Sequence, residues 1–205
     1  MEEIKAVFTF IRHGATAGNL GRRYIGRKTD ESLCSDGILK IMKNKAEGKY
    51  PRADFVFSSP MRRCVETCGL IYGSEKNPEF SPILIEDFCE TDFGCFEGKN
   101  CAELKENTLY KKWLESGGAL PFPEGESRED FSLRSLQGVS RMLSLLGENL
   151  EKDILVSAVV HGGTVMAVLS KLTGKNYYDF HIENGEAVSF RLKISGGKLK
   201  AEILP

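Results

Sequence analysis

The chain has 205 residues, of which 41% are hydrophobic and 28% are charged. The length favours one domain, and the composition excludes a mainly disordered chain, because disorder requires low hydrophobicity and high net charge. The 28 basic and 29 acidic residues give a net charge of −1, so no overall basic excess points to nucleic acid or an anionic membrane as a partner.

Two further features of the sequence bear on the compartment. No apolar run is long enough to predict a transmembrane helix, and the acidic start Met1–Lys5 lacks the pattern of a signal peptide. We therefore expect a cytoplasmic protein. Its six cysteines have neither CxxC nor zinc-finger spacing, which favours reduced thiols over a disulfide framework or a metal site.

Strand-like and helical segments alternate along the chain. Runs of β-branched, aromatic and other apolar residues predict strands at 5–11, 53–57, 83–85, 153–160, 187–194 and 199–204. Helices are expected at 35–50 and 61–72, as two short elements between 101 and 116, over about 20 residues from Ser127, and from about 162 to 173.

This alternation predicts an α/β fold, a three-layer α/β/α sandwich built on a mostly parallel sheet. A hairpin signal at 195–197 adds an antiparallel pair, so the sheet is expected to be mixed. We expect a single domain over residues 1–205, with residues 86–130 forming a lid or cap over the site. The polar and basic stretch 18–35 is expected to be a functional loop.

Three of the predicted strands end in polar residues suited to phosphate chemistry. His13 follows the first strand, Arg62 the second and His161 the strand at 153–160. Ligands of open α/β sheets bind beyond the carboxyl ends of the strands. A neutral histidine is a nucleophile, and the fork of an arginine matches phosphate oxygens. Each residue alone is more often structural, but together they indicate a phosphate site.

The segments around these residues resemble the histidine phosphatase superfamily, also called phosphoglycerate mutase-like. The resemblance rests on the motif Phe10-Ile11-Arg12-His13-Gly14-Ala15-Thr16 with Asn19, and on the segments 23–33, 58–67, 92–98, 123–127 and 161–163. Ala15 departs from the glutamate of many relatives, at a peripheral position. Residues after 173 carry little of the family pattern.

The resemblance implies a covalent mechanism that needs no metal and no cofactor. His13 would become phosphohistidine, and Glu90 would protonate the leaving alcohol and then activate water. Glu86, Asp87, Asp92 and Glu97 lie close in sequence, so the choice of acid stays open. The resemblance assigns the phosphate pocket to Arg12, Arg62 and His161, and further substrate contacts to Thr16, Asn19, Tyr24, Gly26 and Gly162.

The short interval between Glu90 and His161 favours a phosphatase of small phosphate monoesters over a mutase. The loop at 24–33 resembles the branch that acts on α-ribazole 5′-phosphate in cobalamin assembly, while phosphoglycerates, sugar phosphates and nucleotides remain alternatives. A phosphoglycerate mutase is the second hypothesis, and a phosphate-binding regulatory module is the third. The expected partner is a small phosphate ester, and the expected assembly is a monomer or a homodimer.

Overall fold

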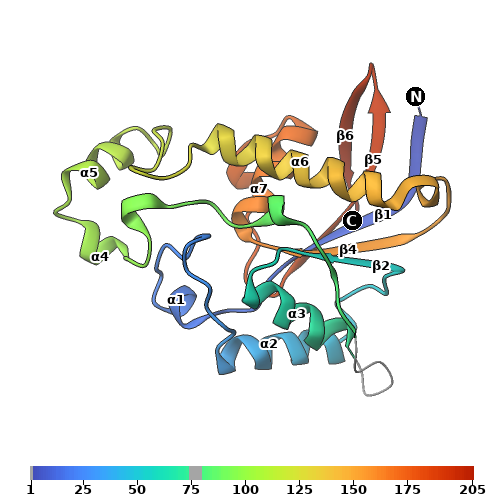
Figure 1. Ribbon diagram of the computed structural model, residues 1–205, viewed down its shortest axis with the longest axis horizontal. Helices are drawn as coiled ribbons and strands as arrows, with labels where there is room; N and C mark the ends of the chain where they lie inside the picture. Colours follow the sequence, from blue (N-terminus) through green and yellow to red (C-terminus); the bar gives the residue numbers. More distant parts are fainter. Residues whose placement is uncertain (1, 74–79) are drawn as a thin grey trace.

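The sheet of this protein runs through the middle of the molecule (Figure 1). The computed structural model describes residues 2–73 and 80–205, and side chains from residue 4 onward. Its strand order is β3-β2-β4-β1-β5-β6, with β3, β2, β4 and β1 parallel and β5 antiparallel to both neighbours. The strands are β1 (Glu2–Arg12), β2 (Phe55–Ser58), β3 (Ile83–Leu84), β4 (Leu155–Val160), β5 (Ala187–Ser195) and β6 (Lys198–Ile203).

Helices cover both faces of the sheet, so the predicted three-layer mixed α/β fold is confirmed. Figure 1 shows α2 (Ser35–Ala46) and α3 (Arg62–Tyr72) on one side of the sheet and α6 (Arg128–Leu146) and α7 (Gly162–Thr173) on the other. The remaining helical elements are α1 (Ala17–Leu20), α4 (Cys101–Leu104), α5 (Thr108–Glu115), η1 (Glu86–Phe88), η2 (Gly94–Phe96), η3 (Gly147–Glu151) and η4 (Tyr177–Phe180).

Alternation along the central strands divides the core between the two faces. Phe8 and Phe10 of β1 join the cluster that packs against α6 and α7, whereas Ile11 joins the cluster that packs against α2 and α3. In β4, Val160 joins the cluster against α6 and α7, and Val159 joins the cluster against α2 and α3. Successive side chains of a strand point to opposite faces, which is why these buried strands are almost continuously apolar.

The structure adds one helix to the predicted set. The stretch expected to be a loop contains α1, a single turn closed by a capping box between Thr16 and Asn19. Each side chain accepts a hydrogen bond from the other residue's backbone N–H, at 3.2 Å in both cases. The short helix therefore follows directly from the Thr-x-x-Asn spacing.

Sheet register determines which residues meet at the carboxyl edge. Arg12 lies opposite Val160 in the β1–β4 pair, and Ser58 lies opposite Val159 in the β2–β4 pair. The residues that follow these three parallel strands therefore emerge next to one another. In the part of the chain that the structure describes, no helix is long and apolar enough to cross a membrane.

Candidate active site

The two histidines lie side by side where β1 and β4 end. Their ring centroids are 5.1 Å apart and the rings are inclined by 66°. The His13 backbone N–H donates to the Val160 carbonyl at 3.0 Å, which extends the ladder by one residue. Burial, reinforced by the charge of Arg63, holds the pKa of both rings well below the usual value. Both imidazoles are therefore neutral near pH 7.

A single hydrogen bond selects the tautomer of His13. Its Nδ1 lies 2.7 Å from the carbonyl oxygen of Gly14. A carbonyl can only accept, so Nδ1 carries the proton. In the neutral ring the lone pair then resides on Nε2, which is the form that can attack phosphorus.

Two guanidinium groups supply the positive charge: that of Arg63 is buried and that of Arg12 is half-buried. Arg12 donates from Nη1 to the Ile182 carbonyl at 2.7 Å. Arg63 donates to the carbonyls of Thr29, at 2.9 Å, and Gly26, at 3.3 Å. The Nε atoms of both arginines are buried and have no hydrogen-bond partner among the described residues. Buried donors without partners are costly, and a phosphate oxygen is the acceptor that a guanidinium prefers.

The structure brings Arg63 rather than Arg62 to the histidines, which corrects the predicted residue. Arg62 is exposed; its backbone N–H donates to Asp30 at 2.7 Å, and its guanidinium lies 3.4 Å from the Ser32 hydroxyl. Successive helix residues are about 100° apart around the axis. Arg63 therefore shares the buried face of α3 with Thr67, and Arg62 points to solvent. This helical period was a signal in the sequence that could have separated the two arginines.

Glu90 is the buried carboxylic acid of the site. Its Oε1 accepts from the Thr91 N–H at 2.9 Å, and its Oε2 accepts from the Gly163 N–H at 3.4 Å. Any other residue at position 163 would place its Cβ 2.4 Å from Oε1. The Glu90 carboxyl group can therefore occupy this position only because residue 163 is glycine. Burial raises the pKa of Glu90, while Arg63 and Arg12 partly oppose the rise. The carboxyl group therefore keeps its proton to higher pH than an exposed glutamate.

The neighbouring acids have other partners. Asp92 pairs with Lys28 at 3.0 Å, Asp87 pairs with Arg141 at 3.3 Å, and Glu97 accepts from the Gly26 N–H at 2.7 Å. Glu86 is exposed. Among these acids Glu90 lines a cavity and also contacts the Gly163 N–H, two residues after His161, which favours it as the proton donor.

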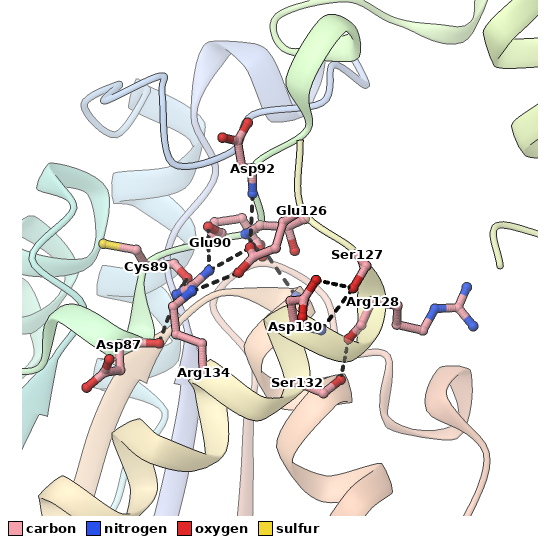
Figure 2. A network of polar contacts seen from close by, with 12 residues as sticks. Asp87, Cys89, Glu90, Asp92, Glu126, Ser127, Arg128, Asp130, Ser132 and Arg134 are labelled. Atoms are coloured by element: carbon pink, nitrogen blue, oxygen red, sulfur yellow. Dashed lines mark hydrogen bonds and ion pairs between the residues drawn. The ribbon is translucent and has the colours of Figure 1, made fainter. Parts of the chain in front are cut away.

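Arg134 of α6 holds the segment that carries Glu90 (Figure 2). Its Nη1 donates to the carbonyls of Asp87 and Cys89, both at 2.9 Å, and its Nη2 donates to the Glu90 carbonyl at 3.3 Å. Its Nε and Nη2 also bind the Glu126 carboxylate, at 2.9 and 2.8 Å. All five N–H groups of this guanidinium are engaged. Arg134 therefore positions Glu90, and reasoning from the sequence missed it.

Thr16 and Asn19 lie beside the nucleophile segment, but their side chains are engaged in the capping box of α1. The Asn184 amide donates to the Asn19 Oδ1 at 3.2 Å and to the His13 carbonyl at 3.1 Å. Thr67 accepts from the Gly14 N–H at 3.0 Å. These contacts fix the peptide group between His13 and Gly14.

The three other predicted contacts have different positions. Gly162 is the first residue of α7, so its N–H has no partner inside the helix and is available to an anion. Tyr24 lines the cavity that begins at Glu90. Gly26 acts indirectly, because its carbonyl accepts from Arg63, and a Cβ there would lie 2.2 Å from the Thr91 carbonyl oxygen.

A thiol lies next to the second histidine. The Cys64 Sγ is 3.6 Å from the His161 Nε2, which also lies 2.9 Å from the Ser59 hydroxyl. Burial raises the pKa of the Cys64 thiol well above its usual value, so it is not a thiolate nucleophile. Within residues 2–73 and 80–205, no group of three histidine, cysteine or acidic side chains is arranged to hold a metal ion.

Comparison with known proteins identifies the family of this chain. The model of the histidine phosphatase superfamily (branch 1) matches residues 8–202. The chain belongs to this superfamily. It is 28% identical to a 2,3-bisphosphoglycerate-dependent phosphoglycerate mutase from Methylorubrum populi, over 93% of this chain and 91% of the mutase. It also matches three longer mycobacterial proteins, of which it spans 46%.

Two solved structures show the same fold. A phosphoserine phosphatase from Entamoeba histolytica, in complex with phosphoserine, superposes with a TM-score of 0.75 at 26% identity, covering 98% of this chain and 95% of that one. The α-ribazole phosphatase from Shigella flexneri superposes with a TM-score of 0.78 at 20% identity, covering 97% and 95%. The family model shows the superfamily, and the relatives named here are a mutase and two phosphatases with different substrates in their names.

Proposed function

We propose that this protein is a metal-independent phosphomonoesterase that hydrolyses small phosphate esters through a phosphohistidine on His13. The observation that carries the proposal is the neutral His13 with a free Nε2, next to two guanidinium groups with buried, unpaired Nε donors. Binding alone would not need an unprotonated nucleophile in that place, which argues against a purely regulatory phosphate-binding module.

In the first step, Nε2 of His13 attacks phosphorus and the bond from phosphorus to the ester oxygen breaks. The leaving oxygen takes the proton of the Glu90 carboxyl group. Arg12 and Arg63 stabilise the negative charge on the transferring phosphoryl group, and His161 and the N–H of Gly162 provide further donors. Positioning and charge stabilisation provide most of the catalysis in phosphoryl transfer.

In the second step, the Glu90 carboxylate accepts a proton from a water molecule as its oxygen attacks phosphorus. The bond from phosphorus to Nε2 breaks, inorganic phosphate leaves, and Nε2 regains its lone pair. One group thus acts first as acid and then as base, which requires a pKa near the working pH. The burial that raises the pKa of Glu90 acts in that direction.

The named relatives include phosphatases and a mutase, and α-ribazole 5′-phosphate remains a candidate ester on the resemblance of the loop at 24–33. A panel of esters separates these functions. We expect phosphate release from 3-phosphoglycerate to exceed isomerisation to 2-phosphoglycerate, even with added 2,3-bisphosphoglycerate. Fast isomerisation with negligible phosphate release would make the protein a mutase.

The covalent intermediate gives the decisive test. After brief reaction with a phosphate-labelled ester and an alkaline quench, the label should be found on His13 in an acid-labile bond. His13→Gln should abolish both label and turnover. The matched control is His181→Gln, since His181 is exposed at the end of η4, and this variant should keep both. Label on another residue, or turnover by His13→Gln, would refute the mechanism.

A further inference from the structure

A cavity of about 220 Å³ is lined by Glu90 but by neither His13 nor His161. One wall consists of the rings of Tyr24, Phe93, Trp113 and Phe122. Neighbouring rings in this wall have centroids 4.9–5.1 Å apart. Aromatic rings at such separations attract one another and form a defined surface. The same cavity is lined by Glu90, the acid proposed to protonate the leaving oxygen, so it offers room for the leaving group of a phosphate ester.

The lining also includes two tyrosines and a cation. Arg128, at the start of α6, lies 5.0 Å from the ring centroid of Tyr177 and 5.6 Å from that of Tyr178. The Tyr177 hydroxyl is 3.4 Å from the Gly163 carbonyl oxygen, next to Glu90. Tyr177 therefore contacts both the Arg128 guanidinium and Gly163, the residue whose N–H binds Glu90.

Two donors of this cavity lack strong acceptors. Arg128 donates only to the Gly118 carbonyl and the Tyr178 hydroxyl, and no described carboxylate lies within ion-pair distance of it. The indole N–H of Trp113 is buried without a partner among the described residues. Arg134 on the same helix has all five donors engaged, whereas Arg128 has guanidinium donors left to bind a ligand.

We propose that the leaving group of the substrate carries an aromatic ring that fills this cavity, with a hydrogen-bond acceptor or negative charge on its outer edge facing Arg128 and the Trp113 indole. This inference rests on the proposed phosphatase function and specifies its substrate class. An apolar cavity of roughly 150 Å³ is large enough for benzene, so 220 Å³ holds one substituted ring. The ester of a small hydroxy acid would leave most of the aromatic surface unfilled and would place its carboxylate against rings.

The test compares alkyl phosphates whose leaving oxygens are chemically alike. Ethyl phosphate, 2-phenylethyl phosphate and 2-(4-carboxyphenyl)ethyl phosphate differ in the ring and in its acceptor. We expect kcat/KM to rise about 100-fold from the first to the second and about tenfold more for the third, with 3-phosphoglycerate resembling ethyl phosphate. Equal values for ethyl and 2-phenylethyl phosphate, or 3-phosphoglycerate as the best ester, would overturn the inference.

Variants assign these preferences to residues. Trp113→Ala should lower the ratio of kcat/KM for 2-phenylethyl over ethyl phosphate about tenfold, and Phe122→Leu should lower it if the first variant does not fold. Leu114→Ala is the matched control, because Leu114 is exposed on the same helix, and it should leave the ratio unchanged. Arg128→Met should remove the advantage of the carboxylate, and the exposed Arg191→Met should not. An unchanged ratio in Trp113→Ala or Arg128→Met would refute the assignment.

Failure of this inference and failure of the phosphatase proposal give different results. p-Nitrophenyl phosphate has a good leaving group, so its hydrolysis measures phosphoryl transfer to His13 independently of the three alkyl phosphates. If it is hydrolysed while the three alkyl phosphates react equally, the phosphatase function stands and the aromatic substrate class is wrong. If it is not hydrolysed and no phosphohistidine forms, the phosphatase function itself is wrong.

Discussion

Replacing Arg134 with methionine should uncouple the Glu90 segment from α6. The substitution removes a guanidinium with five engaged donors, three on backbone carbonyls and two on the Glu126 carboxylate. The side chains of Arg134 and Glu126 are only 16% and 13% exposed, so solvent screens their ion pair little. Removing one partner of such a buried pair costs about 3–5 kcal/mol. The free energy of unfolding should fall by about that amount.

Urea denaturation of the wild type and three variants measures this prediction. Arg141→Met is the matched control on the same helix, because the Arg141 side chain is 62% exposed in its pair with Asp87 and such a pair is worth about 0–1 kcal/mol. Combining Arg134→Met with Glu126→Gln should recover part of the loss, since no unpaired carboxylate then remains. If Arg134→Met costs no more stability than Arg141→Met, the reasoning is refuted.

The same variant has a kinetic signature that a merely structural residue would not give. Arg134 touches Glu90 only through its backbone carbonyl, so losing it should misplace the acid without changing its charge. A displacement of about 1 Å can cost about 100-fold in rate. Phosphohistidine formation should therefore slow by roughly 10–100-fold for an alkyl phosphate and much less for p-nitrophenyl phosphate. Equal slowing for both esters would show that Arg134 does not act through Glu90.

Five further outcomes are expected. Arg63→Met should lower kcat/KM by at least about 10³-fold, whereas Arg62→Met should stay within about threefold; the reverse order in the same assay would restore the residue predicted from the sequence. Glu90→Gln should slow phosphohistidine formation by about 10²–10⁴-fold for an alkyl phosphate and little for p-nitrophenyl phosphate, as rapid-quench bursts would show. Because the pKa of His13 lies well below the usual value of about 6.5, the burst with p-nitrophenyl phosphate should not decline as pH falls from 7.5 to about 6; a midpoint near 6.5 would contradict this. For the same reason the unfolded chain binds more protons than the native one below about pH 6.5, so the free energy of unfolding should decrease as the pH falls through that range. Activity should survive exhaustive EDTA treatment and be inhibited by vanadate, and a strict requirement for Mg²⁺ or Zn²⁺ would overturn the metal-independent mechanism.

Local patterns in the sequence were enough to predict the layers and to place His13 at the end of the first strand. The apolar run of β4 and the alternation in β1 are short-range consequences of burial on both faces of a sheet. Ser127 caps α6 as expected, because its hydroxyl accepts from the Asp130 N–H at 3.0 Å. The two strand ends that carry His13 and His161 were therefore readable from neighbouring residues alone.

Spatial relations between distant residues were decided by the tertiary structure. The helical period separates the faces of Arg62 and Arg63, but only the packing of α3 beside β4 brings the face with Arg63 to the histidines. Arg134 acquires its role because α6 packs against a segment more than 40 residues earlier in the chain. The cavity joins Tyr24 to Trp113 and Tyr177. No local sequence pattern predicts these contacts between distant residues, because they follow from strand order, register and helix packing over the whole chain.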